Sequence, residues 1–238
     1  MDSVLRDIMS EPGVVADTIA EGEARLPKLA ERLRKLSFDK IYTIGTGSSN
    51  FVGLAGRYAL EEWAGIPTLP LSSIDFQVYS LQAADSRSIV IAMSQSGETF
   101  ETIGAARAAK QRGIYTVALT NNDQSRLAQI CDDVILTRAG DEEGPGTKTV
   151  VAQCVAIYHF ALHMARIFKP EKATAIASAL RELGTAPEQV REMLSGQFKK
   201  QLDQVSRQLC TDDNLYMVGE GPFSALAMQS ANMLREAG

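Results

Sequence analysis

From about residue 38 to residue 168, the sequence alternates between short apolar runs and stretches rich in helix-forming residues. The runs are continuously apolar, as is typical of strands covered on both faces, and Gly, Asp, Asn or Ser flanks each of them. Strands of this kind, separated by helices, form a parallel sheet between two helical layers. Five runs fit the description: 40–44, 67–71, 88–93, 116–120 and 134–136. The predicted fold class is therefore α/β, a three-layer α/β/α sandwich around a five-stranded parallel, flavodoxin-like sheet.

Helical patterns lie on both sides of this sheet domain, which we place at residues 37–168. Residues 1–36 carry apolar side chains at helical spacing and form a helical lead-in, which Pro12 and Pro27 divide. Residues 149–168 are predicted to close the sheet domain as a long helix. Residues 169–208 are predicted to be a helical linker that breaks near residues 184–187.

The last residues, 209–238, resemble the start of the sheet domain. Shifting the chain by 174 positions aligns six identical residues in a strand, Gly-x-Gly and helix frame. The pairs are Asp39 with Asp213, Tyr42 with Tyr216, Gly45 with Gly219, Gly47 with Gly221, Leu60 with Leu234, and Glu62 with Glu236. Shared fold constraints could produce these identities, but the ungapped alignment favours duplication. We therefore predict the first strand, near residues 215–218, and the first helix of an incomplete second unit.

Composition limits the classes of partner and the cellular setting. The net charge of −5 over 238 residues argues against a nucleic acid held by bulk electrostatics. Three widely spaced cysteines fit neither a disulfide framework nor a zinc site, which favours a reducing compartment. No signal-peptide pattern opens the chain, and no apolar run approaches the ~20 residues of a membrane span. The sequence predicts a cytoplasmic protein that binds neither nucleic acid nor membrane.

The strongest chemical motif is Ser94-Gln95-Ser96-Gly97-Glu98-Thr99, which follows the third predicted strand. The carboxyl ends of parallel strands are where open α/β sheets bind ligands. Three hydroxyls, an amide and a flexible glycine precede a helix, whose N-terminus adds free N–H groups and a positive dipole end. The loop contains no lysine, so it suits a phosphate monoester held by neutral donors. The alternative is an ordinary Ser/Thr helix cap in a polar turn.

A second polar turn, Thr46-Gly47-Ser48-Ser49, ends the first predicted strand. A dinucleotide fingerprint would require a third glycine at position 50, where the chain has Asn50, so a nicotinamide site is not expected. The turn also lacks the carboxylates of a magnesium-dependent nucleotide site. Because it lies beside the Ser94 loop, Ser49 is predicted to be a second phosphate contact.

These motifs resemble those of the sugar isomerase (SIS) family. The loop from Ser94 to Thr99 is similar to that family's phosphate signature, and 53–58 and 139–148 resemble segments of the isomerase half of glucosamine-6-phosphate synthase. The resemblance implies a phosphosugar ligand and no cofactor. It assigns phosphate binding to one group of residues, which are Ser49, Ser94, Gln95, Ser96 and Thr99. It assigns sugar contacts to another group, which are Gly47, Gly146 and Thr147.

Members of this family that isomerise phosphosugars carry two SIS domains and use a carboxylate on the first helix of the second. Glu236 aligns with that position. A carboxylate facing C1 and C2 can move a proton between them, although Glu236 could equally be a solvated residue at a helix end. The resemblance implies an aldose–ketose isomerase, or a related deaminase or deglycase, acting on a hexose or aminosugar 6-phosphate. The exposed strand–helix unit at residues 209–238 separately predicts a homodimer. No glutaminase segment is expected, and a non-catalytic sugar-phosphate sensor is the alternative.

Other candidate residues have simpler explanations. His159 and His163 share one helix face, but no carboxylate or cysteine nearby in the sequence completes a metal site, so none is predicted. Lys148 could approach a phosphate but is expected to be solvated at a helix start. Glu142 could reach a sugar hydroxyl, although the acidic segment 141–143 is expected to be solvated.

Overall fold

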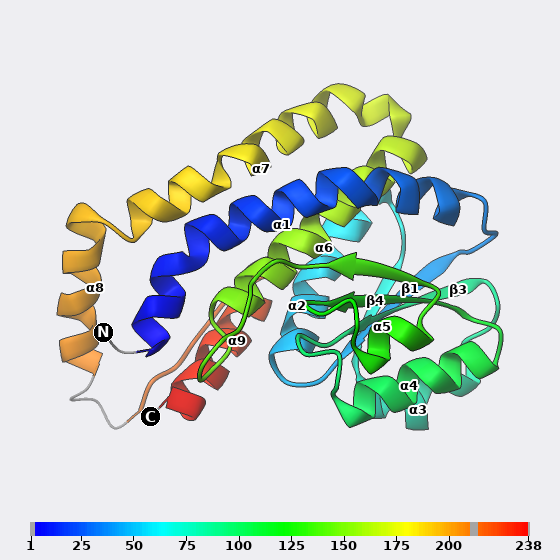
Figure 1. Cartoon of the computed structure of the whole chain (residues 1–238), viewed down its shortest axis with the longest axis horizontal. Helices are drawn as coiled ribbons and strands as arrows, with labels where there is room; N and C mark the ends of the chain where they lie inside the picture. Colours follow the sequence, from blue (N-terminus) through cyan, green and yellow to red (C-terminus); the bar gives the residue numbers. More distant parts are fainter. Residues whose placement is uncertain (1–2, 210–213, 238) are drawn as a thin grey trace.

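A five-stranded parallel sheet forms the centre of the fold, as predicted (Figure 1). The computed structural model describes residues 3–209 and 214–237. The strand order β2-β1-β3-β4-β5 is that of a doubly wound, flavodoxin-like domain. Each predicted apolar run lies within one residue of an observed strand. The strands are β1 (Lys40–Gly45), β2 (Thr68–Ser72), β3 (Ser88–Met93), β4 (Tyr115–Thr120) and β5 (Asp133–Leu136).

Eleven helical segments follow α1 (Ser3–Arg34) within the described residues. Eight of them are α-helices, two are short 3-10 turns (η2 and η3), and one is a π-helical turn (η1) that extends α2. The segments are α2 (Ser48–Ala59), η1 (Leu60–Ala64), α3 (Ser73–Val78), η2 (Ser80–Gln82), α4 (Phe100–Gln111), α5 (Arg126–Ile130), α6 (Lys148–Phe168), η3 (Pro170–Lys172), α7 (Ala173–Met193), α8 (Gly196–Leu209) and α9 (Pro222–Ala237).

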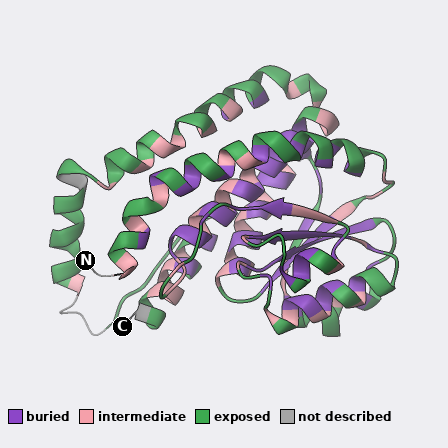
Figure 2. Cartoon of the chain, in the orientation of Figure 1, coloured by how far each residue is buried: buried purple, intermediate pink, exposed green. Residues whose placement is uncertain are grey.

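Each face of the sheet carries its own apolar core (Figure 2). The two cores are separate because successive side chains of a strand point to opposite faces. On β3, the side chains of Ile89, Ile91 and Met93 pack with α1, α2 and α6 on one face. Val90 and Ala92 point to the other face and pack with α3, α4 and α5. Burial on both sides explains why the strands are continuously apolar in sequence.

α1 is one continuous helix, so the prediction that Pro12 and Pro27 divide the lead-in was wrong. A proline inside a helix removes a hydrogen bond and costs about 3 kcal/mol. Tertiary packing offsets that cost here, because α1 buries Leu26, Leu29 and Leu33 against the sheet domain. The helix extends along α6 and contributes to the first of the two cores.

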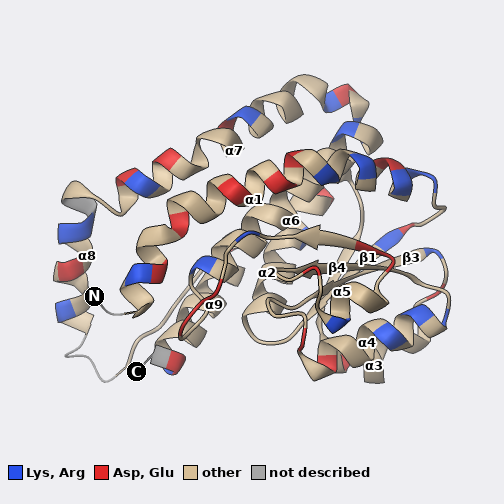
Figure 3. Cartoon of the chain, viewed as in Figure 1, with Lys and Arg blue, Asp and Glu red and all other residues tan. Residues whose placement is uncertain are grey.

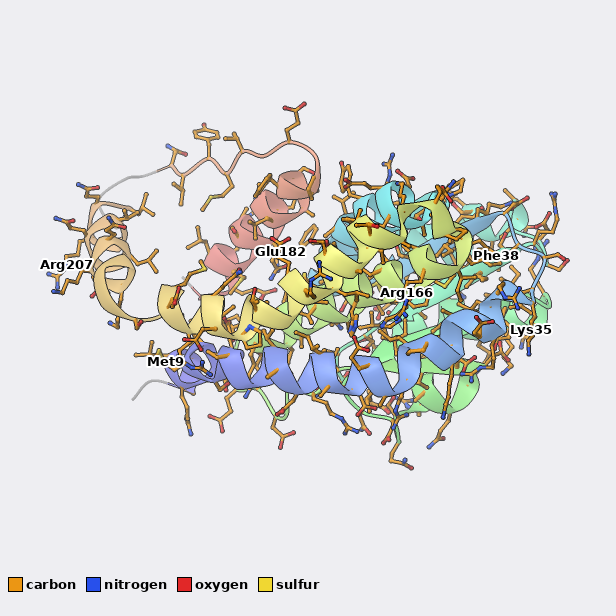
Figure 4. All side chains as sticks on the ribbon, turned by 90° about the horizontal axis from the view of Figure 1, so that it is seen from above. Met9, Lys35, Phe38, Arg166, Glu182 and Arg207 are labelled. Atoms are coloured by element: carbon orange, nitrogen blue, oxygen red, sulfur yellow. The ribbon has the colours of Figure 1, made fainter. Side chains whose placement is uncertain are left out.

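α7 is also continuous, through both Gly184 and Pro187, so the predicted break near residues 184–187 was wrong as well. The chain instead turns after Met193, where Gly196 has a left-handed φ of 68° and α8 begins. α7 packs over α1 and α6, and Figure 4 shows α1 and α7 running side by side. The described side chains of α8 are exposed except that of Leu209, which is half-buried (Figure 2).

The internal repeat has a geometric counterpart in the turns before α2 and α9. Gly47 and Gly221 have φ values of 55° and 58°. The Asn50 N–H donates to the Gly47 carbonyl at 3.0 Å, and the Ser224 N–H donates to the Gly221 carbonyl at 3.0 Å. The same turn therefore opens both helices, which supports the proposal that 209–238 begins a second unit.

The strand predicted at 215–218 is not formed in the described part of the chain. Its residues are exposed, Val218 to 90%. A strand needs a neighbour to accept and donate its backbone hydrogen bonds, and none of the described strands pairs with this segment. Asp213, the first residue of the aligned repeat, lies outside the described residues.

α6 is long and apolar enough to cross a membrane by length and composition alone. Most of its most apolar stretch is buried, against α1, α2 and α7. Phe160, Ala161, Leu162, Met164 and Ala165 are fully buried in the described fold. These contacts identify α6 as a core helix of the domain.

Candidate functional site

The loop between β3 and α4 is built around the Ser94 hydroxyl. Ser94 is 2% exposed, and its Oγ accepts a hydrogen bond from the Gly97 N–H at 3.1 Å and lies 2.8 Å from Thr99 Oγ1. Gly97 has a φ of 68°, which favours glycine. The loop thereby curls at the carboxyl end of β3, as the sequence predicted.

The ordinary helix-cap interpretation does not describe this loop. Thr99 occupies the N-cap position of α4, yet its side chain makes no capping hydrogen bond. The first N–H groups of an α-helix have no partner within the helix. In α4 they are left for a ligand or water, at the positive end of the helix dipole. The arrangement favours the anion-site interpretation over the capping one.

Residues after β4 hold the loop in place, and the sequence analysis missed them. The Asn121 N–H and the Thr120 hydroxyl both donate to the Gln95 carbonyl, at 2.9 and 3.1 Å. Glu98 pairs with Arg126 and accepts from the Arg126 N–H at 2.8 Å. The polar sequence 120–122 follows a strand, as the Ser94 loop does, so the same strand-end argument could have found it.

The turn that contains Gly47 and Ser49 is beside the Ser94 loop, because β1 pairs with β3 and places Gly45 opposite Met93. Ser49 is buried, and its hydroxyl donates to Gln153 Oε1 on α6 at 3.1 Å. Ser49 thus lies at the carboxyl edge of the sheet, as predicted, and its hydroxyl donates its hydrogen bond to α6. Its role as a phosphate contact remains a prediction.

The segment before α6 contains Gly146 and Thr147, which were predicted to contact the sugar. Thr147 is the N-cap of α6, and Glu142 Oε1 accepts hydrogen bonds from its N–H and its hydroxyl at 2.8 and 2.9 Å. The Glu142 carboxylate also accepts from the N–H and the hydroxyl of Thr149. Glu142 is therefore the cap of α6, whereas the sequence analysis had expected it to be solvated or to reach the sugar.

Lys148 was expected to be solvated, with phosphate as its alternative partner. It is instead buried, and its Nζ forms an ion pair with Asp7 Oδ1 on α1 at 2.8 Å. Hydrogen bonds from Lys148 and from the Glu143 N–H lower the pKa of the Asp7 carboxyl. Lys148 thus fastens α1 to the start of α6.

Glu11 on α1 supplies a pH-dependent contribution to stability. Burial, and then the nearby Glu142 carboxylate, raise its pKa from 4.5 to about 7. The unfolded chain ionises Glu11 at a lower pH than the folded chain, so this group makes stability fall as pH rises from about 4.5 to about 7. We expect Glu11→Gln to raise the melting temperature at pH 8 by a few degrees and to leave it unchanged at pH 4.

Thermal melts of the wild type, Glu11→Gln and Glu31→Gln across this pH range measure the effect. Glu31 is exposed on the same helix and pairs with Arg34, so its variant is the matched control. Parallel pH profiles for the wild type and Glu11→Gln would contradict the prediction.

Glu236, the predicted proton carrier, lies near the end of α9. Its side chain is exposed, and Oε1 accepts a hydrogen bond from Asn232 Nδ2 at 2.9 Å. α9 packs on α2, the helix that follows the Ser49 turn (Figure 1). Among the described residues, no hydrogen bond or ion pair links Glu236 to the Ser94 loop.

A cavity of about 620 Å³ opens at the carboxyl edge of the sheet. Gln95 and Ser96 line it, whereas Ser49, Ser94, Thr99, Gly47, Gly146, Thr147 and Glu236 do not. Its wall also contains one more residue of the Ser94–Thr99 loop, residues that follow β4 and β5, and one residue from α1. These further residues are Glu98, Asn121, Asn122, Thr137, Arg138, Gly140, Asp141 and Asp17. The structure therefore brings part of the predicted phosphate set to a ligand-sized, polar cavity.

Comparison with known proteins agrees with this fold. The SIS domain model matches residues 37–163, more than half of the chain. The chain belongs to the SIS domain family. Glutamine–fructose-6-phosphate aminotransferase [isomerizing] from Gloeobacter violaceus is 34% identical over 240 residues, covering 98% of this chain and 39% of that protein. The chain thus spans about two fifths of the length of the curated relatives it matches.

Solved structures agree on the fold. The C-terminal domain of glucosamine-fructose-6-phosphate aminotransferase from Francisella tularensis superimposes with a TM-score of 0.89 at 24% identity, covering 99% of this chain and 67% of that one. Tagatose-6-phosphate ketose/aldose isomerase from Escherichia coli gives a TM-score of 0.71 at 18% identity, covering 95% and 61%. The predicted family and fold class are confirmed.

Proposed function

We propose that this SIS chain binds a hexose or aminosugar 6-phosphate and takes part in its isomerisation between aldose and ketose, or in a related deaminase or deglycase reaction. The observation that carries the proposal is the Ser94–Thr99 loop, in which the Ser94 and Thr99 hydroxyls lie 2.8 Å apart and Thr99 makes no capping hydrogen bond to α4. The SIS family match and the isomerising relatives support the same reaction class.

In this proposal, the phosphate is held by neutral donors. The α4 N–H groups and the hydroxyls of Ser94, Ser96 and Thr99 would bind the phosphate oxygens, together with Gln95. Ser49 joins them when its hydroxyl leaves Gln153. A dianionic phosphate gains most from such preorganised donors, because charge-assisted hydrogen bonds are about twice as strong as neutral ones.

The rest of the ligand would extend toward the cavity and the segment that contains Gly146 and Thr147. Asp17 and Asp141 bring carboxylates to the cavity wall, and acidic residues are spread along α1 (Figure 3). Such a wall suits sugar hydroxyls or an ammonium group better than a second phosphate. An aminosugar phosphate therefore fits this charge pattern well.

The proposed chemistry needs one base that both removes and returns a proton. After ring opening, the Glu236 carboxylate takes the proton from C2 of the aldose, and the electron pair moves onto the C1 carbonyl oxygen to give an enediolate. The O2 hydroxyl proton passes to O1, the carboxylic acid returns its proton to C1, and the ketose carbonyl forms at C2. Glu236 would reach the sugar only when α9 and the ligand are brought together.

The exposed position of Glu236 favours a second candidate, a sugar-phosphate sensor that does not catalyse. Solvent exchange separates the two functions. With glucose 6-phosphate, fructose 6-phosphate or glucosamine 6-phosphate in D₂O, an isomerase incorporates deuterium at C1 or C2, which NMR detects. Binding without exchange would support the sensor and contradict the isomerase.

The proposal includes a cytoplasmic setting and a homodimer. Cys131 and Cys154 are free thiols, as expected in a reducing compartment. Large apolar side chains are exposed on the segment before α9 and on α9 itself, including Tyr216, Phe223 and Leu226. A second copy or further chain that covers them would bury apolar area that is now exposed to water.

A further inference from the structure

Two buried histidines and one carboxylate meet where α1 packs on α6. His159 Nε2 lies 3.0 Å from Glu23 Oε1 and 3.1 Å from His163 Nε2, and the third distance, from Glu23 Oε1 to His163 Nε2, is 3.8 Å. The histidine side chains are 1% and 2% exposed, and that of Glu23 is 54% exposed. Glu23 is the third group that the sequence analysis could not find, because 136 residues separate it from His159.

Hydrogen bonds alone leave this cluster poorly satisfied. His159 Nε2 faces both Glu23 Oε1 and His163 Nε2, and one ring nitrogen either donates or accepts a hydrogen bond but does not do both. A single ring N–H therefore cannot link all three groups of the cluster by hydrogen bonds. Among the described residues, His159 Nδ1 is also buried with no hydrogen-bond partner.

We propose that Glu23, His159 and His163 bind a divalent transition-metal ion, zinc by the chemistry of the donors, which fastens α1 to α6. Zinc takes histidine nitrogen and carboxylate oxygen at about 2.0–2.2 Å in tetrahedral geometry, so its ligand atoms lie roughly 3.4 Å apart. The three observed separations bracket that value. Three protein ligands leave a fourth position for water.

The packing around the cluster fits a preformed site. Both histidines project from α6 at i and i+4, which places them on one helix face. Gly22 on α1 lies against the His159 ring, and a Cβ at that position would overlap His159 Nδ1. The exposed side of Glu23 gives an ion a path from solvent, and α1 contributes several acidic residues to its surroundings (Figure 3).

An ion here would add a further cross-link between α1 and the rest of the domain. Several ion pairs already join them, among them Asp7 with Lys148 and Glu21 with Arg138. Arg138 and the α1 residue Asp17 both line the cavity beside the Ser94 loop. The proposed metal would therefore stabilise the helix that forms one wall of the candidate site, without contacting the ligand.

Metal titration of the chelator-treated 238-residue chain tests the proposal. Cobalt(II) is followed by its visible absorption, which is intense in a tetrahedral site, and zinc is then used to displace it. We expect one ion per chain and a zinc-dependent rise in melting temperature. The cluster contains both histidines of the chain, so His163→Ala should abolish the cobalt spectrum and the thermal shift.

Glu23→Gln changes a half-exposed side chain, so it should preserve the fold while weakening zinc binding about tenfold or more. Glu31→Gln, on the exposed side of the same helix, should bind zinc as the wild type does. The proposal is overturned if the wild type binds neither ion at one per chain. It is also overturned if Glu23→Gln and His163→Ala both bind cobalt with the wild-type affinity and spectrum.

Discussion

Replacing Gly97 with alanine is expected both to disrupt the Ser94–Thr99 loop and to destabilise the domain. Gly97 has a φ of 68°, and a Cβ there would overlap the Ser125 side chain and lie 2.9 Å from Thr120 Oγ1. The left-handed conformation costs about 1 kcal/mol or more for alanine, and overpacking adds roughly 1–3 kcal/mol. We expect a loss of about 3 kcal/mol in the free energy of unfolding.

The same change should weaken sugar-phosphate binding at least ~100-fold, since displacing the loop misdirects several charge-assisted donors. Gly113→Ala is the matched control. Gly113 has a φ of 73° but no atom within 4 Å of the position of its Cβ, so its variant should lose only about 1 kcal/mol and bind normally. Urea unfolding and calorimetry measure both effects. Equal destabilisation in the two variants would contradict the packing argument.

Replacing Glu236 with glutamine is expected to abolish most of the proton transfer while leaving phosphate binding intact. Glutamine keeps the shape of the side chain and its hydrogen bond from Asn232, but it cannot accept the C2 proton. General-base catalysis typically contributes 10²–10⁴-fold, so deuterium exchange and kcat should fall about 10³-fold with little change in KM.

Glu220→Gln serves as the control for this experiment. Glu220 is an exposed carboxylate in the turn before α9, and its variant should exchange deuterium at the wild-type rate. If Glu236→Gln keeps the wild-type exchange rate, then another group is the base. In that case, the assignment of Glu236 fails while the phosphate site stands.

Local sequence patterns were sufficient to predict the sheet and the Ser94 loop. Continuous apolar runs identify strands buried on both faces, and the carboxyl edge of a parallel sheet locates a ligand loop. Pro12 and Pro187 misled the analysis, because packing of α1 and α7 overrides a local helix breaker. The strand at 215–218 could not form without a neighbour, although the turn after it repeats that of Gly47.

Contacts between segments that are distant in the sequence could not be predicted from sequence patterns. Glu142 caps α6, and Lys148 pairs with Asp7 on the first helix. Glu23 likewise meets His159 only because α1 packs along α6. In each case, which residue the side chain contacts depends on how two segments pack. The spacing of residues within one segment does not indicate that contact.

The central claim is that the Ser94–Thr99 loop makes this chain a phosphosugar-binding protein. Calorimetric titration of the wild type with glucosamine 6-phosphate and with glucosamine tests it most directly. If the loop holds the phosphate, the phosphorylated sugar should bind one per chain and at least ~100-fold more tightly than the free sugar. Equal affinity for the two, or no binding of either, would contradict the account.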